Sequence, residues 1–504
     1  MLAIIDSGSL HGIEAFPVHV EVNTGERGEL RWVIVGLPDT AVKESQNRVF
    51  SALGNSGFRL PTSRTTINLA PGNLRKEGPF YDLPIALAII AATQQSTLSL
   101  ASQFLVAGEL SLSGQTRPIA GAFNLALLAK KLKKRGLLLP KESALPATFV
   151  EGIEVYGVET LKQCVEFLSQ RLSLSPLPHT LCANSNTADF IYDLSAVRGQ
   201  KILKRAVEIA VAGNHNLLMM GPPGCGKSMI AKCIPELMPN PTHEEWLEIL
   251  QIQSACGSHN DPTLYKRPFR SPHHNISDAG LIGGGIIPQP GEISLAHGGV
   301  LFLDELPEFR RSVLEMLRQP LEEGKVTIVR TSGKLTFPCQ TLLIAALNPC
   351  PCGYLGSRQR RCHCSSVQIQ KYRARISGPL LDRMDLQLEV QPVDLSAFQT
   401  TLPTEEKSTD VKKRIAKARD IQLERAKTYN AYLSATQVDR FCYLNTQEQQ
   451  WLHKACEQLQ ISARAYHKIL KIARTIADLS GESCIQRQHL MEAMQYRCFD
   501  RTWQ

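Results

Sequence analysis

The spacing of hydrophobic residues predicts that the first part of the chain alternates strands and helices. Apolar runs bounded by Gly, Pro or Asn at Val18–Val22, Trp32–Val35 and Thr65–Leu69 are typical of β-strands. Ala41–Leu53 has apolar residues at helical spacing and contains neither Gly nor Pro. The apolar run Ile85–Ala92 is far shorter than the roughly 20 residues that span a bilayer, so we expect a buried helix there.

The middle of the chain, from about residue 190 to about residue 390, contains continuous apolar runs that predict a parallel sheet. These runs are Asn216–Met220, Val300–Leu303 and Thr341–Leu347, and strands buried on both faces have this composition. A helical pattern opens soon after the first run, at Met229–Ile234. Such alternation of strand and helix is that of an α/β domain.

The last part of the chain is almost wholly helical in pattern, and Lys412–Tyr432 is rich in Ala, Lys, Arg and Glu, which are strong helix formers. Ser173–Ala188 is rich in Pro, Ser and Asn and is predicted to be a linker. The fold class is therefore α/β. The predicted parts are a front α+β domain (1–170), the linker (171–189), an α/β core (190–392) and a helical C-terminal part (393–504).

Bulk composition excludes little beyond fibrous, disordered and membrane-spanning proteins. With 504 residues, the chain is too long for one hydrophobic core. The start Met1–Asp6 has neither a basic segment nor a long apolar stretch, so we expect no signal peptide. The 14 cysteines should then be mostly reduced thiols in a cytoplasmic protein with no membrane partner.

The distribution of charge is more informative than the net charge of +9. Gly324–Leu381 contains neither Asp nor Glu. It carries Lys325, Arg330, Lys334, Arg358, Arg360, Arg361, Lys371, Arg373 and Arg375. A segment of this kind is a candidate contact surface for a polyanion, with nucleic acid as the first hypothesis.

A phosphate-binding loop is predicted directly after the first apolar strand. The sequence GPPGCGKS fits the pattern GxxxxGK[ST], and both the strand before it and the helix after it are the context that this motif needs. Lys227 is expected to reach the β- and γ-phosphate oxygens and Ser228 to ligate Mg²⁺, while backbone N–H groups surround the phosphates. The residues expected to bind ATP are Gly221, Pro222, Pro223, Gly224, Cys225, Gly226, Lys227 and Ser228.

Polar side chains follow the other two predicted strands. Asp304 and Glu305 come directly after the second strand, and Asn348 follows the third. We expect Asp304 to hold Mg²⁺, Glu305 to polarise the attacking water and Asn348 to orient that water. Without the phosphate-binding loop upstream, Asp304 and Glu305 could simply be acidic residues at the end of an ordinary strand, and Asn348 could be a turn residue.

Several motifs resemble those of the magnesium-chelatase-related AAA+ proteins, and among them those of the ComM (YifB-like) family. The resemblance extends over essentially the whole chain. The motifs are Asp193–Gln200, the GPPGCGKS loop, Gly291–Phe309 and Asn348–Gly353, with Gly36–Pro38 and Asn68–Pro71 near the front. The resemblance implies a P-loop AAA+ core, a helical lid and an ATPase that works as a ring.

The front domain resembles the proteolytic domain of Lon-type proteases, which has a ribosomal S5 domain 2-like fold; Ala107–Gly114 and Pro118–Gly121 carry this likeness. Phe80 stands where the nucleophilic serine is expected, and Leu125 near the position of the activating lysine. Without nucleophile and base, we expect no protease activity. The basic run Lys130–Arg135 could touch DNA, or could end a helix that Gly136 caps.

The resemblance implies two arginines in catalysis. Gly378–Arg383 is similar to an arginine-finger segment, which would place Arg383 against the γ-phosphate held by a neighbouring subunit. Taken alone, Arg383 could equally be a surface ion-pair partner, and Arg375 is a competing candidate. Ser462–Arg464 opens a predicted helix and resembles the sensor-2 segment of the lid, although Arg464 could be an ordinary helix residue.

The family also has two inserts that line the pore of its rings. Ser271–Gly285 resembles the helix-2 insert, and Val326–Phe337 resembles the pre-sensor hairpin. The hairpin lies within the acid-free segment, so both inserts are candidates for contact with the polyanion.

Four cysteines, Cys350, Cys352, Cys362 and Cys364, lie within fifteen residues. Four thiolates on two short arms could close a tetrahedral Zn²⁺ site, with His363 as a possible substitute ligand. Their spacing is CxC twice rather than the commoner CxxC, and the alternative is a set of reduced thiols in a loop.

We therefore expect an ATP- and Mg²⁺-dependent ring, a hexamer, that moves single-stranded or branched DNA. The family resemblance sharpens this to a branch-migration helicase in recombination or natural transformation. The alternative is an AAA+ motor for chelatase-type metallocofactor assembly, and a Lon-like protease is the third hypothesis.

Overall fold

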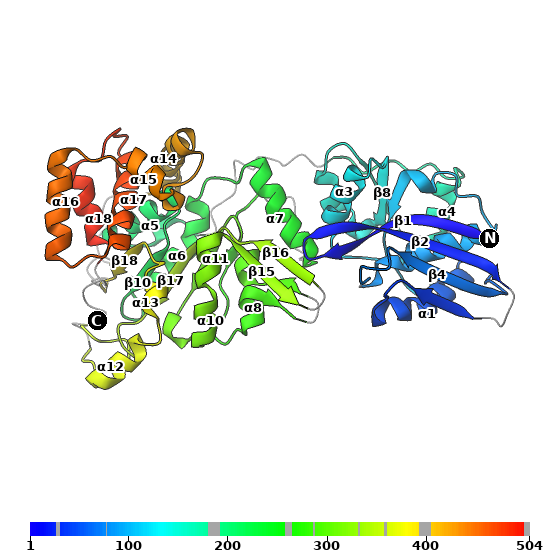
Figure 1. The fold of residues 1–504 in the computed structure, drawn as a ribbon, viewed down its shortest axis with the longest axis horizontal. Helices are drawn as coiled ribbons and strands as arrows, with labels where there is room; N and C mark the ends of the chain where they lie inside the picture. The colour runs from blue at the N-terminus through cyan, green and yellow to red at the C-terminus, as the bar shows by residue number, and fades with distance from the viewer. Residues whose placement is uncertain are drawn as a thin grey trace. The chain divides into compact units, whose positions relative to one another are not determined.

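The computed structural model describes residues 1–26, 31–76, 78–179, 192–257, 265–285, 288–330, 333–356, 360–392 and 405–497. Glu77, Arg358 and much of the predicted linker lie outside these ranges. The chain forms two compact units (Figure 1). Unit 1 comprises Met1–Ser185, His243–Tyr265 and Thr327–Phe337, and unit 2 comprises Asn186–Thr242, Lys266–Val326 and Pro338–Gln504.

Unit 1 begins with a sheet of four strands in the order β1-β2-β4-β3, in which β1, β2 and β4 are antiparallel and β3 pairs parallel with β4. Its strands are β1 (Leu2–His11), β2 (Glu14–Glu26), β3 (Trp32–Val35) and β4 (Arg64–Ala70). The helices α1 (Thr40–Asn55) and α2 (Asp82–Ala92) contribute to its core. Both predicted helices are confirmed, and every residue of the run Ile85–Ile90 is buried.

A second sheet of unit 1 is parallel, with β5 (Phe104–Val106), β8 (Gly136–Pro140) and β9 (Glu154–Val158) in that order. A small hairpin of β6 (Glu109–Leu110) and β7 (Thr116–Arg117) contacts α2, and the helices that follow it in the chain are α3 (Ala122–Lys131) and α4 (Leu161–Leu168).

The prediction that Gly136 caps the helix before it was wrong. Helix α3 ends at Lys131, and the left-handed residue that follows is Lys133, with φ of 54°. Gly136 instead opens β8, where a Cβ atom would lie 2.3 Å from the backbone oxygen of Glu154 on β9. Close approach of two strands requires this glycine, because any side chain would separate them.

Two excursions from the middle of the chain belong to unit 1. The first is helix α7 (His243–Ala255), whose Trp246, Ile249 and Leu250 share a buried core with α3. The second is the hairpin of β15 (Lys325–Arg330) and β16 (Gly333–Pro338), the predicted pre-sensor hairpin. A Cβ atom added to Gly12 would lie 3.2 Å from the side chain of Leu335, so this hairpin reaches the turn between β1 and β2.

Unit 2 is built on a five-stranded parallel sheet in the order β11-β14-β17-β10-β18. Its strands are β10 (Leu217–Met220), β11 (Phe269–Arg270), β14 (Val300–Leu303), β17 (Leu342–Leu347) and β18 (Leu386–Glu389). The three apolar runs that predicted buried strands are β10, β14 and β17, and all their residues are buried. The parallel α/β core is thereby confirmed.

Helices and short hairpins connect these strands. They are α5 (Lys201–Gly213), α6 (Lys227–Leu237), α8 (Asp278–Ile282), β12 (Gly283–Gly284), β13 (Gln289–Pro290), α9 (Glu292–Leu295), α10 (Arg311–Met316), α11 (Arg318–Glu323), α12 (Ser366–Arg373) and α13 (Gly378–Leu381). The predicted helix-2 insert corresponds to α8 with the β12–β13 hairpin.

The C-terminal part is helical, as the sequence predicts. Its helices are α14 (Ser408–Ala426), α15 (Ala435–Phe441), α16 (Thr446–Gln458), α17 (Ala463–Leu479) and α18 (Arg487–Gln495). Among the residues that the structure describes, no helix is both long and apolar enough to cross a membrane.

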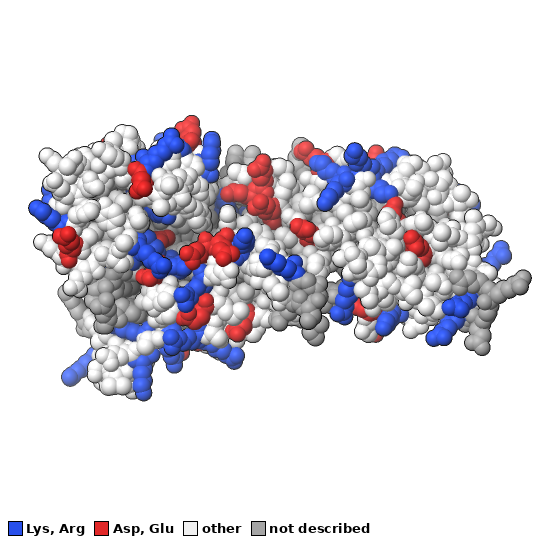
Figure 2. All heavy atoms as spheres, in the orientation of Figure 1, with Lys and Arg blue, Asp and Glu red and all other residues white. Residues whose placement is uncertain are grey.

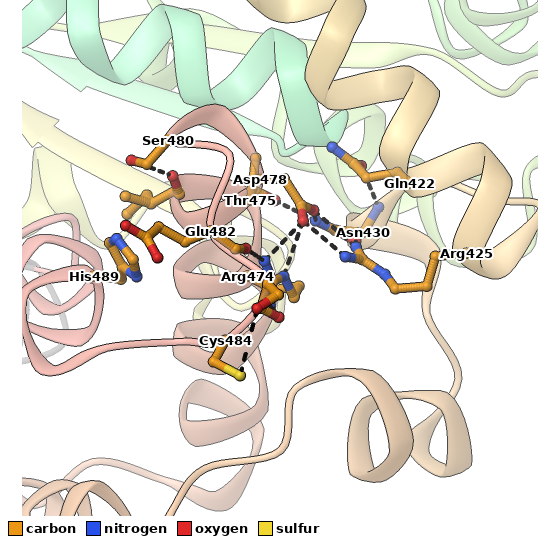
Figure 3. A network of polar contacts seen from close by, with 12 residues as sticks. Gln422, Arg425, Asn430, Arg474, Thr475, Asp478, Ser480, Glu482, Cys484 and His489 are labelled. Atoms are coloured by element: carbon orange, nitrogen blue, oxygen red, sulfur yellow. Dashed lines mark hydrogen bonds and ion pairs between the residues drawn. The ribbon is translucent and has the colours of Figure 1, made fainter.

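A buried carboxylate joins the C-terminal helices (Figure 3). Asp478 on α17 accepts hydrogen bonds of 2.7 and 2.8 Å from Arg425 on α14 and one of 3.0 Å from Arg474. Asn430, in the segment after α14, donates to the same carboxylate at 2.8 Å. The side chain of Asp478 is fully buried, so its charge depends on both arginines for compensation. The network makes α14 and α17 one packed body.

Candidate functional site

The predicted phosphate-binding loop connects β10 to α6. Gly224 and Gly226 have φ of 79° and 88°, a conformation that residues with side chains rarely adopt. A Cβ atom on Gly221 would lie 2.5 Å from the backbone oxygen of Val390, so β18 also restricts this position to glycine. Helix α6 starts at Lys227 with its free backbone N–H groups at the loop, which favours binding of an anion there.

Lys227 is buried against the loop that precedes it. Its ammonium donates to the backbone oxygens of Gly221 and Pro222 at 2.6 and 3.0 Å. It also donates to Asn348 Oδ1 at 3.3 Å. The structure thus brings together a lysine and an asparagine that lie 121 residues apart and were predicted from separate motifs.

Ser228 and Asp304 lie side by side where β10 and β14 end. The hydroxyl of Ser228 donates to Asp304 Oδ2 at 2.7 Å, and the other carboxylate oxygen accepts from the backbone N–H of Glu305 at 2.9 Å. A hydroxyl and a carboxylate at this separation are oxygen ligands of the kind that Mg²⁺ prefers.

Glu305 adopts a left-handed backbone conformation, with φ of 52°. Such a conformation is unfavourable for a residue with a side chain, and it turns the exposed carboxylate of Glu305 away from the strand. His274 Nδ1 lies 3.7 Å from Glu305 Oε2, and the centre of the His274 ring lies 4.1 Å from that of His273, with the two rings tilted by 33°. Sequence reasoning assigned both histidines to an insert and missed this contact with Glu305.

Tyr372 on α12 is a second residue that the sequence did not reveal. Desolvation, followed by the negative charge of Glu308, raises the pKa of Tyr372 to about 12. The backbone of Asn348 donates a hydrogen bond to its hydroxyl, which acts in the opposite direction. Tyr372 therefore connects α12 to the residue that contacts Lys227. The competing arginine candidate, Arg375, lies nearby and pairs with Glu308 at 2.8 Å.

The two arginines that the resemblance implicates lie elsewhere, at the opposite edge of the sheet. Arg383 lies three residues before the start of β18, and its guanidinium contacts Glu322. Arg464, on α17, is 76% exposed and lies 3.9 Å from Asp382. Both line a cleft of about 530 Å³ that also includes Asn216, at the start of β10.

The segment that carries Arg383 is fastened to helix α17. Lys468 forms an ion pair of 2.8 Å with Asp385 and donates to the backbone oxygens of Asp382 and Met384. Burial acts to raise the pKa of Asp385, but the charge of Lys468 and a hydrogen bond from His215 hold that pKa below its ordinary value. The position of Arg383 therefore depends on the C-terminal helices.

The four clustered cysteines meet in space. Cys350 Sγ lies 3.3 Å from Cys352 Sγ and 3.6 Å from Cys362 Sγ, and the sulfur atoms of the whole group, with Cys364, lie within 4.8 Å of one another. All four are free thiols. Hydrogen bonds from the backbones of Tyr354 and His363 reach Cys352, and the pKa of this thiol falls to about 6.

In unit 1 the two positions compared with Lon-type proteases carry apolar side chains. Phe80 lies in a single turn of 3₁₀-helix (Pro79–Tyr81), and Leu125 is fully buried in α3. The neighbouring Asn124 donates to the backbone of Gln251 at 3.1 Å, so α7 covers this part of α3. Neither position offers a nucleophile or a base.

Comparison with protein families gives three matches along the chain. Residues 193–398 match the family described as magnesium chelatase, subunit ChlI, and residues 405–497 match the C-terminal model of that subunit. Residues 20–143 match a model described as subunit ChlI of Mg-chelatase.

Three relatives are similar to this chain over nearly its full length. A protein of Haemophilus influenzae described as competence protein ComM is 45% identical, with 100% of this chain and 99% of the relative covered. The protein YifB of Escherichia coli is 41% identical, with 99% and 98% covered. A protein of Mycobacterium tuberculosis is 35% identical, with 92% of each chain covered.

Proposed function

We propose, from the premise that this chain belongs to the ComM (YifB-like) family of magnesium-chelatase-related AAA+ ATPases, that it is an ATP-driven ring motor that moves DNA. The observation that carries the proposal is the meeting of Lys227, Ser228, Asp304 and Asn348 at the carboxyl edge of the unit 2 sheet. Ligands of parallel α/β sheets bind at this edge.

ATP and Mg²⁺ are the ligands that this arrangement fits. In our proposal the backbone of Gly221–Ser228 surrounds the phosphates, and Lys227 neutralises the β- and γ-oxygens. Ser228 and Asp304 hold Mg²⁺, Glu305 polarises the attacking water and Asn348 orients it. The contact between Lys227 and Asn348 supports this assignment, because both side chains would face the γ-phosphate.

Arg383 and Arg464 are proposed to act on the nucleotide of a neighbouring subunit. Both line the cleft at the amino edge of the sheet, whereas the phosphate-binding loop leaves the carboxyl end of β10. Four residues of strand, about 13 Å, separate these edges, so neither arginine is placed to reach the loop of its own chain. A closed ring, with six subunits as our hypothesis, would bring the two edges of adjacent subunits together.

DNA is proposed as the substrate for two reasons. The acid-free segment 324–381 supplies positive charge without a neighbouring carboxylate in sequence. A relative of the same length is described as a competence protein, and natural transformation is a process that acts on DNA. We propose that the motor drives branch migration of single-stranded or branched DNA during recombination or transformation.

Zinc is proposed as a further metal. The four sulfur atoms of Cys350, Cys352, Cys362 and Cys364 lie close enough for one tetrahedral ion, and thiolates are ligands that Zn²⁺ prefers.

Chelatase-type metallocofactor assembly is the second candidate. The front domain does not argue against it, because residues 20–143 match a model described as subunit ChlI of Mg-chelatase. The relative described as a competence protein and the acid-free segment favour DNA as the substrate. A Lon-like protease is disfavoured by Phe80 and Leu125.

The decisive experiment measures ATP hydrolysis by the purified chain with and without single-stranded and forked DNA. We expect strong stimulation by DNA that Glu305→Gln abolishes, while Glu44→Gln, an exposed carboxylate on α1, leaves it unchanged. If a clean basal ATPase ignored DNA, the motor proposal would fail, and stimulation by a chelatase partner with porphyrin would become the next test.

A further inference from the structure

A basic arm follows the sheet strand that ends at Asn348. We use this name for residues 360–375, which include α12 and contain neither Asp nor Glu. Its cations Arg360, Arg361, Lys371 and Arg375 are exposed. Figure 2 shows Lys and Arg side chains gathered at the lower left of the molecule, where Figure 1 places α12.

Few buried side chains within the basic arm hold it in position. Helix α12 is eight residues long, and Tyr372 is its one buried residue. An isolated helix of this length is unstable in water, so contacts outside the helix must hold it. Contacts of this kind include the hydroxyl of Tyr372, which is bonded to the backbone of Asn348, the ion pair of Arg375 with Glu308, and the cysteine cluster.

The geometry of the cluster fits a tetrahedral thiolate site. Zn–S bonds of about 2.3 Å place the sulfur atoms of such a site about 3.8 Å apart. Three of the sulfur–sulfur separations here are 3.3, 3.6 and 3.6 Å. These distances exceed the roughly 2.05 Å of a disulfide. The backbone N–H of Cys364 also points to Cys362 Sγ at 3.4 Å, and such second-shell hydrogen bonds are typical of metal-bound thiolates.

The position of the cluster links the arm to the nucleotide site. Cys350 and Cys352 follow Asn348 directly, whereas Cys362 and Cys364 precede Ser365, which caps the start of α12. An ion bound by all four would therefore tie the end of β17 to the start of the arm. Tyr372 ties the end of the arm to the same residue, Asn348.

We propose that Cys350, Cys352, Cys362 and Cys364 bind one Zn²⁺, and that this zinc clasp holds the basic arm as a contact surface for the phosphate backbone of nucleic acid. Contact with the arm is transmitted to Asn348 through Tyr372 and so raises the rate of ATP hydrolysis. This inference rests on the proposed DNA motor and assigns one of its DNA contacts. Nucleic acid is the partner because the exposed cations Arg360, Arg361 and Lys371 lie on a segment that itself carries no carboxylate. Such a segment fits a backbone that carries one charge per roughly 1.7 Å of duplex.

Zinc content is the first test, and it needs no DNA. Elemental analysis of the full chain, purified with zinc and a reductant, should give one zinc per chain. The double variant Cys362→Ser, Cys364→Ser should contain almost none, whereas Cys484→Ser, an exposed thiol, should keep its zinc. A zinc-free wild-type chain, or a double variant that kept its zinc, would overturn the clasp.

DNA affinity is the second test, measured by the anisotropy of a labelled single-stranded oligonucleotide at several salt concentrations. The double cysteine variant should bind at least about tenfold more weakly, with unchanged affinity for a fluorescent ATP analogue as evidence that unit 2 is folded. Lys371→Gln should keep zinc and lower the salt dependence by about one counterion, and Lys413→Gln on α14 should not. Loss of zinc with unchanged DNA affinity would overturn the role of the arm.

The Tyr372→Phe variant tests whether contact with DNA is transmitted from the arm to Asn348, because it removes the hydroxyl and keeps the ring. We expect normal zinc content and DNA affinity, with stimulation by DNA, measured relative to the variant's own basal ATPase rate, reduced several-fold. Full stimulation in this variant would overturn the transmission step. If instead the wild-type ATPase ignored DNA, the proposed motor itself would be wrong, and the zinc measurement would still stand.

Discussion

The two edges of the unit 2 sheet differ in how they hold their functional side chains. At the carboxyl edge, Asp304 and Asn348 directly follow strands, and Lys227 and Ser228 open helix α6. Lys227 bonds to Asn348, and Ser228 bonds to Asp304. At the amino edge, Arg383 is held through its neighbours, which are fastened to a helix of the C-terminal part by Lys468. At the first edge, each functional side chain stands at or near the end of its own strand or at the start of the next helix, whereas at the second edge a helix of the C-terminal part holds the segment in place.

This difference has a consequence for the proposed ring. A chain carries all the proposed phosphate and metal ligands at one edge and both proposed catalytic arginines at the other. Each chain would therefore be incomplete alone, and hydrolysis would require that the amino edge of one subunit meet the carboxyl edge of the next. Movement of the C-terminal helices would then displace Arg383 and change activity in the neighbouring subunit.

Removing the lysine of the carboxyl edge should have the largest effect. Lys227→Ala takes away the charge that is proposed to face the β- and γ-phosphates, so we expect ATP hydrolysis to fall at least about 100-fold. The rate of ATP hydrolysis is measured as steady-state release of phosphate. Activity near the wild-type level would contradict the assignment of this edge as the nucleotide site.

The Arg383→Ala variant should lose activity about 100-fold while it still binds a fluorescent ATP analogue, because an arginine that stabilises the transition state adds little to ground-state binding. Mixing Arg383→Ala chains with Lys227→Ala chains tests whether the two edges act together across the interface between subunits. Mixed rings would contain interfaces with an intact loop from one chain and Arg383 from the other, so activity should partly return. No recovery in rings shown to be mixed would argue that Arg383 acts within its own chain or not at all.

Lys468→Met should loosen the amino edge without touching the phosphate loop. It leaves Asp385 without its ion-pair partner in a mostly buried position, and we expect a loss of about 3 kcal/mol in the free energy of unfolding of unit 2. Urea unfolding followed by circular dichroism measures it. Lys413→Met breaks an exposed pair of 3.8 Å with Asp410 and should change stability by less than about 1 kcal/mol.

The same pair predicts a dependence on pH. The pKa of Asp385 is lower in the folded chain than in the unfolded one, so this carboxylate adds stability above pH ~4 that is lost as the pH falls further. Stability measured from pH 7 down to pH 3 should therefore decline in the wild type, and less steeply in Lys468→Met. Equal slopes in the two proteins would show that Asp385 is not stabilised by Lys468.

Arg464→Ala should have the smallest effect of these variants on the folded chain. Its side chain is 76% exposed and pairs with Asp382 at only 3.9 Å, so thermal unfolding should hardly change. If Arg464 contacts the nucleotide of a neighbour, the ATPase rate should still fall at least several-fold. An unchanged rate would remove Arg464 from the proposed site and leave Arg383 as its one arginine.

The sequence by itself determined the elements of the carboxyl edge. The runs Asn216–Met220, Val300–Leu303 and Thr341–Leu347 are strands, and the glycines of the GPPGCGKS loop adopt the backbone that the motif requires. These features were predictable because hydrophobic continuity and loop chemistry act between residues that are close in sequence. The meeting of Asp304 with Ser228 follows from the parallel order of the strands.

Only the tertiary structure decided which distant residues serve that edge and the opposite one. Tyr372 reaches Asn348 and Lys468 fixes the segment of Arg383, yet neither residue stands in a pattern that marks it. His274 lies in the predicted helix-2 insert, but no pattern pointed to its contact with Glu305. Helix α7 likewise packs in unit 1 although its chain neighbours belong to unit 2. A side chain's partner across many residues is chosen by packing and charge in the folded chain, and such pairings leave no periodic trace in the sequence.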